Sequence, residues 1–504
     1  MTAASIGLRF WDVAHSRPEH PFVRYATGES YTYAQQFRRS SGVADSLESR
    51  GIGRGDRVLV MLDNEPGFID TMLACALTGV VMVPINTNLA GAALASLVPR
   101  ARAAAVISSA SHLDALEEVD FGGARLVVGD DGVARTGWEP LPIELADRPR
   151  KPAQVTAMDA FSIVFTSGTT GRSKGAILSH AHCAARSQSY VDGLEVDETD
   201  VMYTCLPLFH NNAQMASVLV ALLAGGATVV YPQFSLSRFW DQIADEGATR
   251  VTLIARMANQ LLELYEGAVP KHRLRTACIV PAPRGDDTFA NRFGVRVVSQ
   301  YYGSTEMIPM PPDVDQPERP GSCGRPSPDY DCQIVGADGN PVADGEVGEL
   351  VVRPRHPYGV MNGYFDMPQE TLRAFRGLWF HTGDTMRRDT EGFYYLTGRM
   401  GDFIRSKGEN VSTREIEAAA ERHPLITGAA AVGAPDEWDD EKILLFVELR
   451  HGSTLVDDDV ARFCAESLPR FMQPDEVIVV SELPRNALGR VEKHRIARPR
   501  HAGE

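Results

Sequence analysis

The sequence predicts an α/β protein: a large N-terminal domain of helix-covered, mostly parallel sheets plus a β-rich subdomain, then a small α+β C-terminal domain. The chain has 504 residues, which is too long for one ordinary domain. Short apolar, β-branched runs alternate with segments of helix length, as in parallel sheets covered by helices. Short strands and turns predominate after residue 332, and a further α+β pattern follows residue 402. We therefore expect domains at 1–401 and 402–504.

Apolar spacing predicts the elements of the large domain in order. Ser179 is a suitable N-cap for the helix that follows it. We expect helices at 7–15, 33–50, 66–78, 90–100, 180–192, 214–224 and 256–265. We expect strands within 22–33 and at 57–62, 80–85, 104–108, 161–165, 176–178, 203–208, 227–231, 250–254 and 295–299.

Composition and patterning predict the connections and the C-terminal domain. Segment 130–159 is rich in proline, glycine and charge and indicates a surface connection, and 313–325 indicates a proline-rich loop. Segment 332–353 predicts short strands and turns. In the C-terminal domain we expect helices at 412–422 and 457–468, and strands at 429–434, 443–450 and 477–480.

Charge and cysteine usage exclude several classes of protein. A net charge of −16 argues against nucleic-acid binding, because the phosphate backbone would be repelled. The seven cysteines are scattered, without a CxxC pair, which argues against a zinc site and favours a reducing compartment. The N-terminus has no apolar signal core, and the apolar run 217–231 is too short to span a membrane. We expect a soluble cytoplasmic protein without a membrane partner.

The segment 161–175, FSIVFTSGTTGRSKG, is the first candidate site. A buried strand leads into a loop of hydroxyl side chains and glycines, whose backbone N–H groups can approach an anion closely. Lys174 adds a positive charge. The Walker phosphate loop requires Gly-Lys-Ser/Thr, which is absent here. Taken alone, the pattern fits a phosphate cradle and a plain hairpin tip about equally well. The candidate nucleotide-binding residues are Thr166, Ser167, Gly168, Thr169, Thr170, Gly171 and Lys174.

A second candidate site is the sequence QYYGSTE at 300–306. Tyr302 and Gly303 offer an aromatic face for a purine and a close backbone approach. Thr305 can donate a hydrogen bond to an α-phosphate. Glu306 can bind Mg²⁺, a cation that prefers oxygen ligands. The alternative is a turn that ends a strand, with a solvated glutamate.

Three further motifs carry polar groups that suit a nucleotide or a substrate. Asp384, in Thr-Gly-Asp, can accept hydrogen bonds from both ribose hydroxyls, although Asp is also a common turn former. Arg399 can donate to ribose or phosphate. Taken by itself, the segment 403–411, FIRSKGENV, predicts a surface hairpin. His210, in Phe-His-Asn-Asn, is a candidate substrate-orienting group or a structural histidine.

These motifs together resemble the acyl-adenylate-forming superfamily, in its acyl-CoA synthetase branch. TSGTTGxxKG, YGxTE, TGD, the segment at 398–408 and a C-terminal Pro-x-x-x-x-Gly motif occur in the family's order, and the resemblance runs from about Leu8 to Ile496. The resemblance implies that the first loop holds the ATP β- and γ-phosphates, Tyr302 stacks on adenine, Glu306 holds Mg²⁺ and Asp384 binds ribose.

The resemblance also implies a mobile C-terminal domain. In the family, the residue matching Asp402 is the hinge about which this domain rotates between half-reactions. The implied CoA-binding residues, which line the pantetheine tunnel, are Ser406, Lys407 and Gly408. The candidate acyl-pocket residues are His210, Asn211, Met215, Val280 and Ser304.

The sequence departs from the family at two informative places. The C-terminal motif usually ends in a lysine that reaches the substrate carboxylate and the α-phosphate, and here the residue is Arg490. Arginine keeps the charge but is bulkier and has a different reach. The hypothesis is that adenylation is weakened while thioester formation survives; alternatively, Arg490 or the nearby Lys493 serves adequately. Segment 278–282 replaces the usual Gly-Gly-Ala, so the shape of the acyl pocket is expected to differ.

The resemblance implies an acyl-CoA ligase that uses ATP or a supplied acyl-AMP, CoA and Mg²⁺. Its partners would be a small carboxylic acid or the acyl-adenylate of that acid, and a separate adenylating enzyme if adenylation is lost. Homodimers are common in the family. One alternative is an adenylation enzyme that loads a carrier-protein phosphopantetheine, and another is a non-catalytic acyl-adenylate-binding protein. A luciferase-like oxygenase is disfavoured. The sequence does not name the acid.

Overall fold

The computed structural model describes residues 5–129, 135–143, 145–146, 150–166, 173–280, 282, 286–399, 403–406, 409–435, 441–450, 452–466, 468, 472–485 and 491–496. The chain divides into two compact units. The first comprises Met1–Cys332 with Val352–Phe380, and the second comprises Gln333–Val351 with His381–Glu504. Asp402 lies outside the described residues, so the expected domain boundary at that residue stays a prediction.

Two seven-stranded sheets form the framework of the first unit. In the first sheet, ordered β7-β6-β5-β3-β4-β8-β9, neighbouring strands are parallel except β8 with β9. In the second, ordered β14-β13-β12-β10-β11-β1-β2, only β1 with β2 is antiparallel. The strands of the first sheet are β3 Arg57–Met61, β4 Val81–Pro84, β5 Ala105–Ser108, β6 Ala124–Val128, β7 Glu139–Leu141, β8 Ala160–Thr166 and β9 Lys174–Ser179. Those of the second are β1 Pro21–Tyr25, β2 Ser30–Thr32, β10 Val201–Thr204, β11 Ala227–Val230, β12 Arg250–Ile254, β13 Thr276–Val280 and β14 Arg296–Val298.

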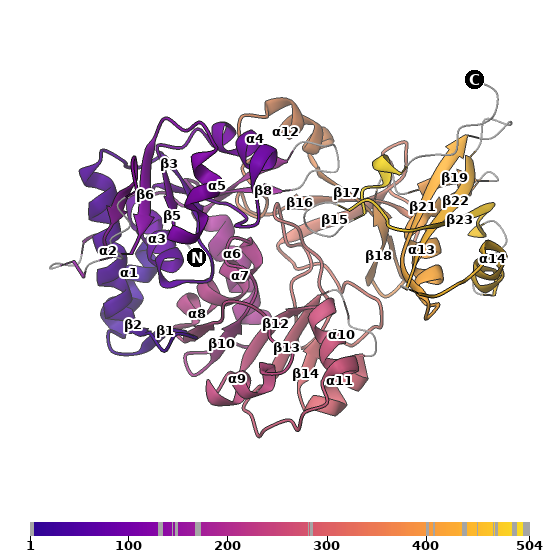
Figure 1. Ribbon diagram of the computed structural model, residues 1–504, viewed down its shortest axis with the longest axis horizontal. Helices are drawn as coiled ribbons and strands as arrows, with labels where there is room; N and C mark the ends of the chain where they lie inside the picture. Colours follow the sequence, from indigo (N-terminus) through magenta and orange to yellow (C-terminus); the bar gives the residue numbers. More distant parts are fainter. Residues whose placement is uncertain are drawn as a thin grey trace. The chain divides into compact units, whose positions relative to one another are not determined.

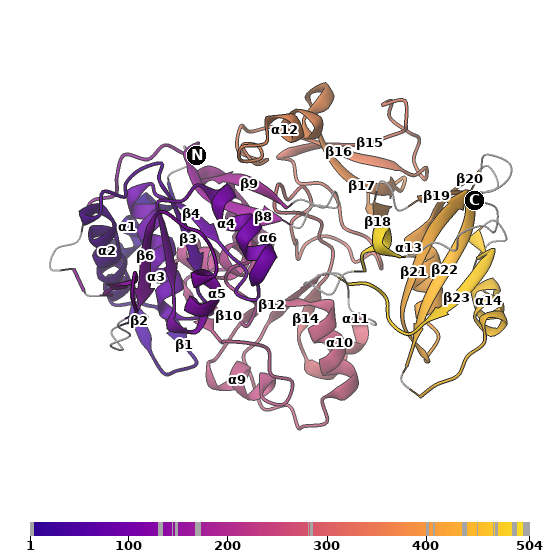
Figure 2. The same cartoon turned by 45° about the horizontal axis from the view of Figure 1, so that its top comes forward.

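Helices cover these sheets because their apolar faces must be buried. The helix α3 is buried at every position after its first proline, and it packs with α1 and α2 (Figure 1). In both views α10 and α11 lie beside β13 and β14 (Figures 1 and 2). The helices of this unit are α1 Ile6–Ser16, α2 Tyr33–Ser49, α3 Pro66–Thr78, α4 Gly91–Ala101, η1 Ala110–His112, α5 Leu113–Glu117, α6 His180–Gly193, α7 Asn211–Ala213, η2 Gln214–Val218, α8 Leu219–Ala224, α9 Phe239–Asp245, α10 Ala255–Leu264, α11 Asp286–Phe293, α12 Pro368–Ala374 and η3 Arg376–Leu378.

A four-stranded sheet corresponds to the expected β-rich subdomain. Its strands, in the order β15-β16-β17-β18, are β15 Tyr330–Val335, β16 Gly348–Pro354, β17 Phe380–Arg388 and β18 Tyr394–Arg399. The rest of the second unit is α+β, as the sequence predicts. It contains β19 Phe403–Ser406, β20 Glu409–Ser412, α13 Thr413–Glu421, β21 Ile426–Pro435, β22 Glu441–Leu449, α14 Asp457–Ala465, β23 Glu476–Val480 and η5 Lys493–Arg495. Figure 2 shows α13 and α14 beside the sheet β21-β22-β23.

The predicted class of fold is therefore confirmed, and local differences have physical reasons. The expected surface connection at 130–159 contributes the edge strand β7, whose backbone pairs with β6 although its sequence, Glu-Pro-Leu, has no strand pattern. The expected helix at 214–224 begins as the π-helix η2, Gln214–Val218, before it becomes α8. No helix in the described ranges combines the length and the apolar content that crossing a membrane requires.

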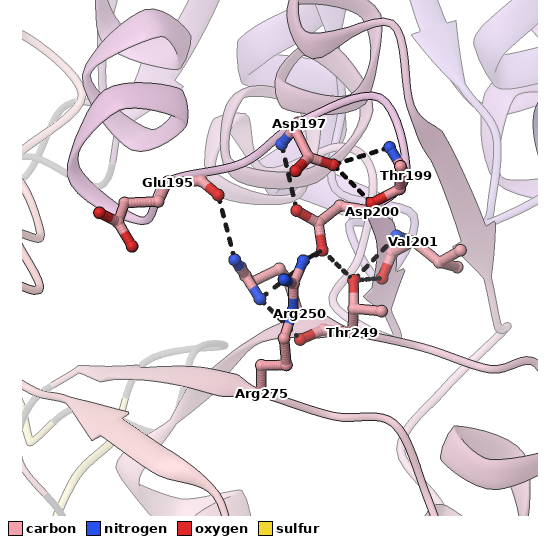
Figure 3. A network of polar contacts seen from close by, with 8 residues as sticks. All are labelled: Glu195, Asp197, Thr199, Asp200, Val201, Thr249, Arg250 and Arg275. Atoms are coloured by element: carbon pink, nitrogen blue, oxygen red, sulfur yellow. Dashed lines mark hydrogen bonds and ion pairs between the residues drawn. The ribbon is translucent and has the colours of Figure 1, made fainter.

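A buried polar network lies where three parallel strands begin (Figure 3). Asp200 precedes β10, Thr249 precedes β12 and Arg275 precedes β13. The Asp200 carboxylate, whose side chain is fully buried, accepts hydrogen bonds from Thr249 and Arg275 and lies 3.6 Å from Arg250. The backbone N–H of Asp197 donates to its other oxygen at 3.1 Å. Because ligands of open α/β sheets bind at the carboxyl ends of strands, we assign this network to stability.

Candidate active site

The predicted phosphate-loop segment is held by an antiparallel strand pair. Strands β8 and β9 place Thr166 opposite Lys174, and the Thr166 hydroxyl donates to the Lys174 carbonyl oxygen at 3.3 Å. At the C-terminal flank of the loop, Arg100 donates to the Ser173 carbonyl oxygen at 2.6 Å. Ser167, Gly168, Thr169, Thr170 and Gly171 lie outside the described residues. The two flanks of the loop are thus fixed side by side, and its phosphate-binding role stays a prediction.

Lys174 is engaged by two side chains from one later segment of the chain. Its Nζ atom lies 2.9 Å from Glu370 Oε2 and 5.2 Å from the centre of the Tyr364 ring. The hydrogen bond and charge of Lys174 lower the pKa of the Glu370 carboxyl group. Both side chains of the ion pair are about a fifth exposed, so an incoming anion can compete with Glu370 for the ammonium group.

Residues 302–310 form a compact turn. Tyr302 and Met310 exchange backbone hydrogen bonds of 2.9 and 3.3 Å, and the Ser304 N–H donates to the Met307 carbonyl oxygen at 2.9 Å. A Cβ atom on Gly303 would lie 2.9 Å from the Tyr301 hydroxyl and 3.0 Å from the Met307 carbonyl oxygen. A larger residue at this position would force these neighbours to shift, so the close approach favours glycine.

The Glu306 carboxylate is oriented by two hydroxyl groups. Ser304 donates to Oε2 at 2.7 Å, and Tyr364 donates to Oε1 at 3.0 Å. A carboxylate has about four acceptor positions, so these two bonds leave room for a cation. Among the described residues, no group of three or more His, Cys, Asp or Glu side chains is arranged to hold a metal. One carboxylate fits Mg²⁺, which usually combines one or two carboxylates with substrate phosphates and water.

The segment around Tyr364 joins the two motifs. Phe365 donates its N–H to Gly175 at 2.7 Å, and Ile177 donates to Gly363 at 2.9 Å, so the segment pairs with β9. Its other end reaches the turn, where the Met361 N–H donates to the Glu306 carbonyl oxygen at 2.9 Å. Lys174, Tyr364 and Glu306 therefore form one chain of contacts. The sequence analysis missed Tyr364, because only a Gly-Tyr pair in a loop marks it.

The helix α6 contributes two further residues that the sequence analysis missed. Ser179 caps the helix, as predicted, by accepting from the His182 N–H at 3.0 Å. His182 Nδ1 lies 3.1 Å from the Tyr358 carbonyl oxygen, and Arg186 donates to the Ser304 carbonyl oxygen at 2.5 Å. The helix thus supports the turn that carries Glu306.

The candidate acyl-pocket residues lie at the end of β13, in the turn at 302–310, at the start of α7 and in the π-helix. Val280 ends β13, Ser304 lies in the turn described above, and Met215 is buried in η2. His210 precedes α7; its ring lies 4.6 Å from the Phe209 ring, and desolvation lowers its pKa. Buried polar atoms gather in this segment. Those without a hydrogen-bond partner among the described residues are Asn211 Nδ2, Asn212 Oδ1, Gln214 Oε1 and Ser217 Oγ.

The second unit contains the predicted ribose motif. Strands β17 and β18 place Asp384 directly opposite Arg399 in the register, which brings these two candidates together. The turn is anchored on Glu349, which accepts from the Gly383 N–H at 3.1 Å and lies 2.7 Å from His381 Nδ1. Gly383 has a φ of +71°, a conformation that favours glycine.

The remaining candidates lie in the C-terminal part of the second unit. Ser406 ends β19, which forms a hairpin with β20. The Lys493 ammonium donates to Thr413 at 2.6 Å and lies 2.7 Å from Glu417 Oε1, so it ties η5 to α13. The residues that lie outside the described part of the chain are Asp402, Lys407, Gly408 and Arg490.

Acid is expected to destabilise the first unit through His180 and His182. Burial, with the Arg186 charge adding to it at His182, lowers the pKa of both to about 4. The unfolded value is about 6.5, so below that pH the unfolded chain binds more protons. The free energy of unfolding should therefore fall between pH 6.5 and 4, by up to about 3 kcal/mol for each imidazole. Thermal melting across pH 4–8 checks this; a His180→Asn variant with an unchanged pH slope would contradict it.

Comparison with known families agrees with this geometry. The sequence pattern of the family described as AMP-binding enzyme matches residues 10–365, and that of the AMP-binding enzyme C-terminal domain matches residues 415–490. The chain therefore belongs to the AMP-binding enzyme family. It is a member of the acyl-adenylate-forming superfamily in its acyl-CoA ligase branch, and its enzyme class is that of the acid–thiol ligases.

Individual relatives extend over nearly the whole chain. A crotonobetaine/carnitine–CoA ligase of Escherichia coli O157:H7 is 31% identical over 480 residues, which are 92% of this chain and 92% of that protein. ATP-bound MatB from Rhodopseudomonas palustris has a TM-score of 0.82 and 28% identity, covering 98% of both chains. The o-succinylbenzoate CoA synthetase MenE from Bacillus subtilis, in complex with the acyl-adenylate intermediate OSB-AMP, has a TM-score of 0.84 over 98% of both chains. Its 24% identity supports the fold alone.

Proposed function

We propose that this acyl-CoA ligase binds ATP or a supplied acyl-AMP, activates a polar carboxylic acid, and transfers the acyl group to CoA, with adenylation weakened at Arg490. The observation that carries the proposal is the chain of contacts from Lys174 through Tyr364 to Glu306. It joins the phosphate-loop lysine to the candidate metal-binding carboxylate within one unit. A plain hairpin tip and a solvated glutamate would not require that connection.

The two half-reactions have simple chemistry. In the first, a carboxylate oxygen attacks the α-phosphorus of ATP, and pyrophosphate leaves. In the second, the CoA thiol loses its proton and its sulfur attacks the acyl carbonyl carbon, whereupon AMP leaves with the bonding electrons. Activation is needed because a free carboxylate is a poor electrophile. Stabilisation of charge that develops in the transition state is usually the largest catalytic contribution of such a site.

Each candidate residue has a role in this scheme. Thr166 to Gly171 and Lys174 bind the β- and γ-phosphates, and Tyr302 and Gly303 approach the adenine. Thr305 donates to the α-phosphate, and Asp384 with Arg399 binds the ribose. Glu306 would hold Mg²⁺, which neutralises phosphate charge when bound. Ser406, Lys407 and Gly408 line the path of the CoA thiol, and Asp402 acts as the hinge.

At the C-terminal position where the family usually has lysine, this chain has Arg490. The side chain of Lys493 is already committed to Glu417 and Thr413. That pairing favours a structural role for Lys493 and leaves Arg490 as the residue that must reach the carboxylate and the α-phosphate. Because arginine and lysine differ in size and geometry, this position is the natural cause of a weakened first half-reaction.

The acid is proposed to be polar rather than a long alkyl chain. Each buried polar group without a partner costs about 1–3 kcal/mol, and four such atoms lie between Asn211 and Ser217. This segment adjoins His210, in the part of the chain that borders the acyl group in the resemblance. A bound acid that offers hydrogen-bonding groups would satisfy them. A relative at 31% identity that is named for crotonobetaine and carnitine supports this choice.

The decisive experiment separates the two half-reactions. A panel of short polar, aromatic and fatty acids is tested for AMP release from ATP, and synthetic acyl-AMPs are then supplied with CoA, using the wild type and Arg490→Lys. We expect thioester from supplied acyl-AMP in both, and faster AMP release in Arg490→Lys. Wild-type adenylation as fast as that of Arg490→Lys would show that Arg490 is tolerated. Absence of thioester from any acyl-AMP would overturn the proposed ligase.

The same assays distinguish the alternatives. A carrier-loading enzyme would transfer the acyl group to a phosphopantetheinyl carrier protein and leave CoA unused. A non-catalytic acyl-adenylate-binding protein would bind acyl-AMP and release no AMP when CoA is added. We favour CoA because the chain lies in the acyl-CoA ligase branch.

Freeing Lys174 from Glu370 is expected to strengthen ATP binding. Glu370→Gln keeps the shape of the side chain but removes the charge that competes with phosphate for the ammonium group. Because such partly exposed pairs are weak, KM for ATP should fall by about 2–5-fold. Initial rates over a range of ATP concentrations measure this. Arg373→Met is the control, because the exposed Arg373 contacts the same carboxylate at 2.8 Å without touching Lys174. A higher KM in Glu370→Gln would mean that Glu370 orients Lys174 productively.

A further inference from the structure

Helix α6 has a buried arginine, Arg186, that contacts the turn at Ser304–Glu306. His182 and Arg186 are four residues apart, so they lie on the same face of the helix. They are 1% and 4% exposed. Arg186 faces the turn and donates to the Ser304 carbonyl oxygen at 2.5 Å, whereas His182 Nδ1 lies 3.1 Å from the Tyr358 carbonyl oxygen.

The guanidinium group of Arg186 has no acidic partner in the described part of the chain. Its second terminal nitrogen donates to the Tyr301 hydroxyl at 3.1 Å, and its Nε atom has no hydrogen-bond partner there. The titratable groups around it are the side chains of Tyr301, Tyr190, Tyr330 and Cys183, none of which is a carboxylate. A buried charge without a counter-ion is strongly unfavourable. Arg250, the other buried arginine described above, has the Asp200 carboxylate at 3.6 Å.

We propose that Arg186 is a positioning residue for the adenylation site: it fixes the Ser304–Glu306 turn and supplies a buried positive charge that an anionic nucleotide at this turn compensates. The inference rests on the proposed function, because that function places the α-phosphate at Thr305. The fork of the guanidinium group holds the turn through Ser304 and Tyr301. The charge acts over a longer range, in surroundings that screen it less than water does.

The two roles can be separated by two substitutions. Arg186→Lys keeps the charge and loses the planar fork, whereas Arg186→Met loses both. We expect Arg186→Met to weaken AMP binding at least about 10-fold and to lower kcat by about 100-fold. Arg186→Lys should recover most of the AMP affinity and only part of kcat, because the turn is no longer fixed by two hydrogen bonds. AMP binding is measured by titration calorimetry and kcat by thioester formation.

The same substitutions at Arg250 are the matched control. Arg250 is equally buried but lies where strands begin, away from the turn, so Arg250→Lys and Arg250→Met should lower the melting temperature without changing AMP affinity. If Arg186→Met and Arg186→Lys lower only the melting temperature, Arg186 is merely structural and the inference is overturned. If Arg186→Met does not fold, Arg186→Lys is the test. AMP affinity close to the wild-type value together with a lowered kcat supports the inference, whereas unchanged AMP affinity and unchanged kcat overturn it.

Failure of the proposed function is distinguishable from failure of this inference. A wild type that binds AMP in an Arg186-dependent way, but forms no thioester, would refute the ligase and support the role of Arg186 in nucleotide binding. A wild type that forms thioester, with both Arg186 variants keeping its AMP affinity and kcat, would support the ligase and refute the role of Arg186. A wild type that binds no adenine nucleotide would overturn both.

Discussion

Glu306→Gln is expected to lower kcat/KM for MgATP by about 10²–10³-fold in the ATP-dependent reaction. Glutamine has the same shape, and its amide can still form hydrogen bonds with the hydroxyls of Ser304 and Tyr364, which now lie at 2.7 and 3.0 Å from the carboxylate. The turn should therefore keep its geometry and lose only the charge. Pyrophosphate release measured over a range of Mg²⁺ concentrations should show both a lower rate and a weaker apparent affinity for Mg²⁺.

Tyr364→Phe is the matched control for that prediction. It removes one hydrogen bond to Glu306 and leaves both the carboxylate charge and the ring beneath Lys174. A hydrogen bond to a charged group contributes about 1.5–3 kcal/mol, so the rate should fall by at most roughly 10–150-fold, with a nearly unchanged dependence on Mg²⁺. If the dependence on Mg²⁺ is unchanged in Glu306→Gln as well, the carboxylate charge is not needed and Glu306 is only a structural acceptor.

Most of the fold was predictable because its signals are local. The runs at 57–62, 104–108 and 250–254 are apolar and β-branched, and the structure has β3, β5 and β12 there. The N-cap at Ser179 was predictable because it depends on the type of a single side chain. The strand β7 was not predictable, because its pairing with β6 supplies what its own sequence lacks. The π-helix η2 was missed because an apolar run predicts a helix without indicating its hydrogen-bond register.

The residues of the candidate site also differ in whether local sequence predicts them. The flanks of the phosphate loop and the turn at 302–306 are contiguous motifs, and the sequence therefore indicates them. Tyr364 acts on Glu306 from 58 positions away, and Arg186 acts on Ser304 from 118 positions away. Neither residue belongs to a motif, and only the pairing of the Tyr364 segment with β9 and the packing of α6 bring them to the turn. The residues that orient a site are thus harder to predict than those that contact a ligand.

Asp200→Asn is expected to produce the largest loss of stability, about 3–5 kcal/mol in the free energy of unfolding of the first unit. The asparagine oxygen could still accept from Thr249 or Asp197, but it would leave Arg250 buried without a counter-ion (Figure 3). Burial already lowers the pKa of Arg250, which shows how unfavourable its charged form is in this place. The network joins the starts of β10, β12 and β13, so its loss should loosen three neighbouring strands together.

Arg275→Met tests whether burial is the reason for that loss. Arg275 contacts the same carboxylate, but about half of its side chain is exposed, whereas the Arg250 side chain is 5% exposed. Water can replace the Arg275 contact, so this variant should lose less than about 1 kcal/mol. Denaturant unfolding of both variants measures the difference, and AMP affinity should stay at the wild-type value in each, because the network lies where the strands begin. Equal losses in the two variants would mean that the hydrogen-bond geometry at Asp200, rather than the buried charge of Arg250, stabilises this edge of the sheet.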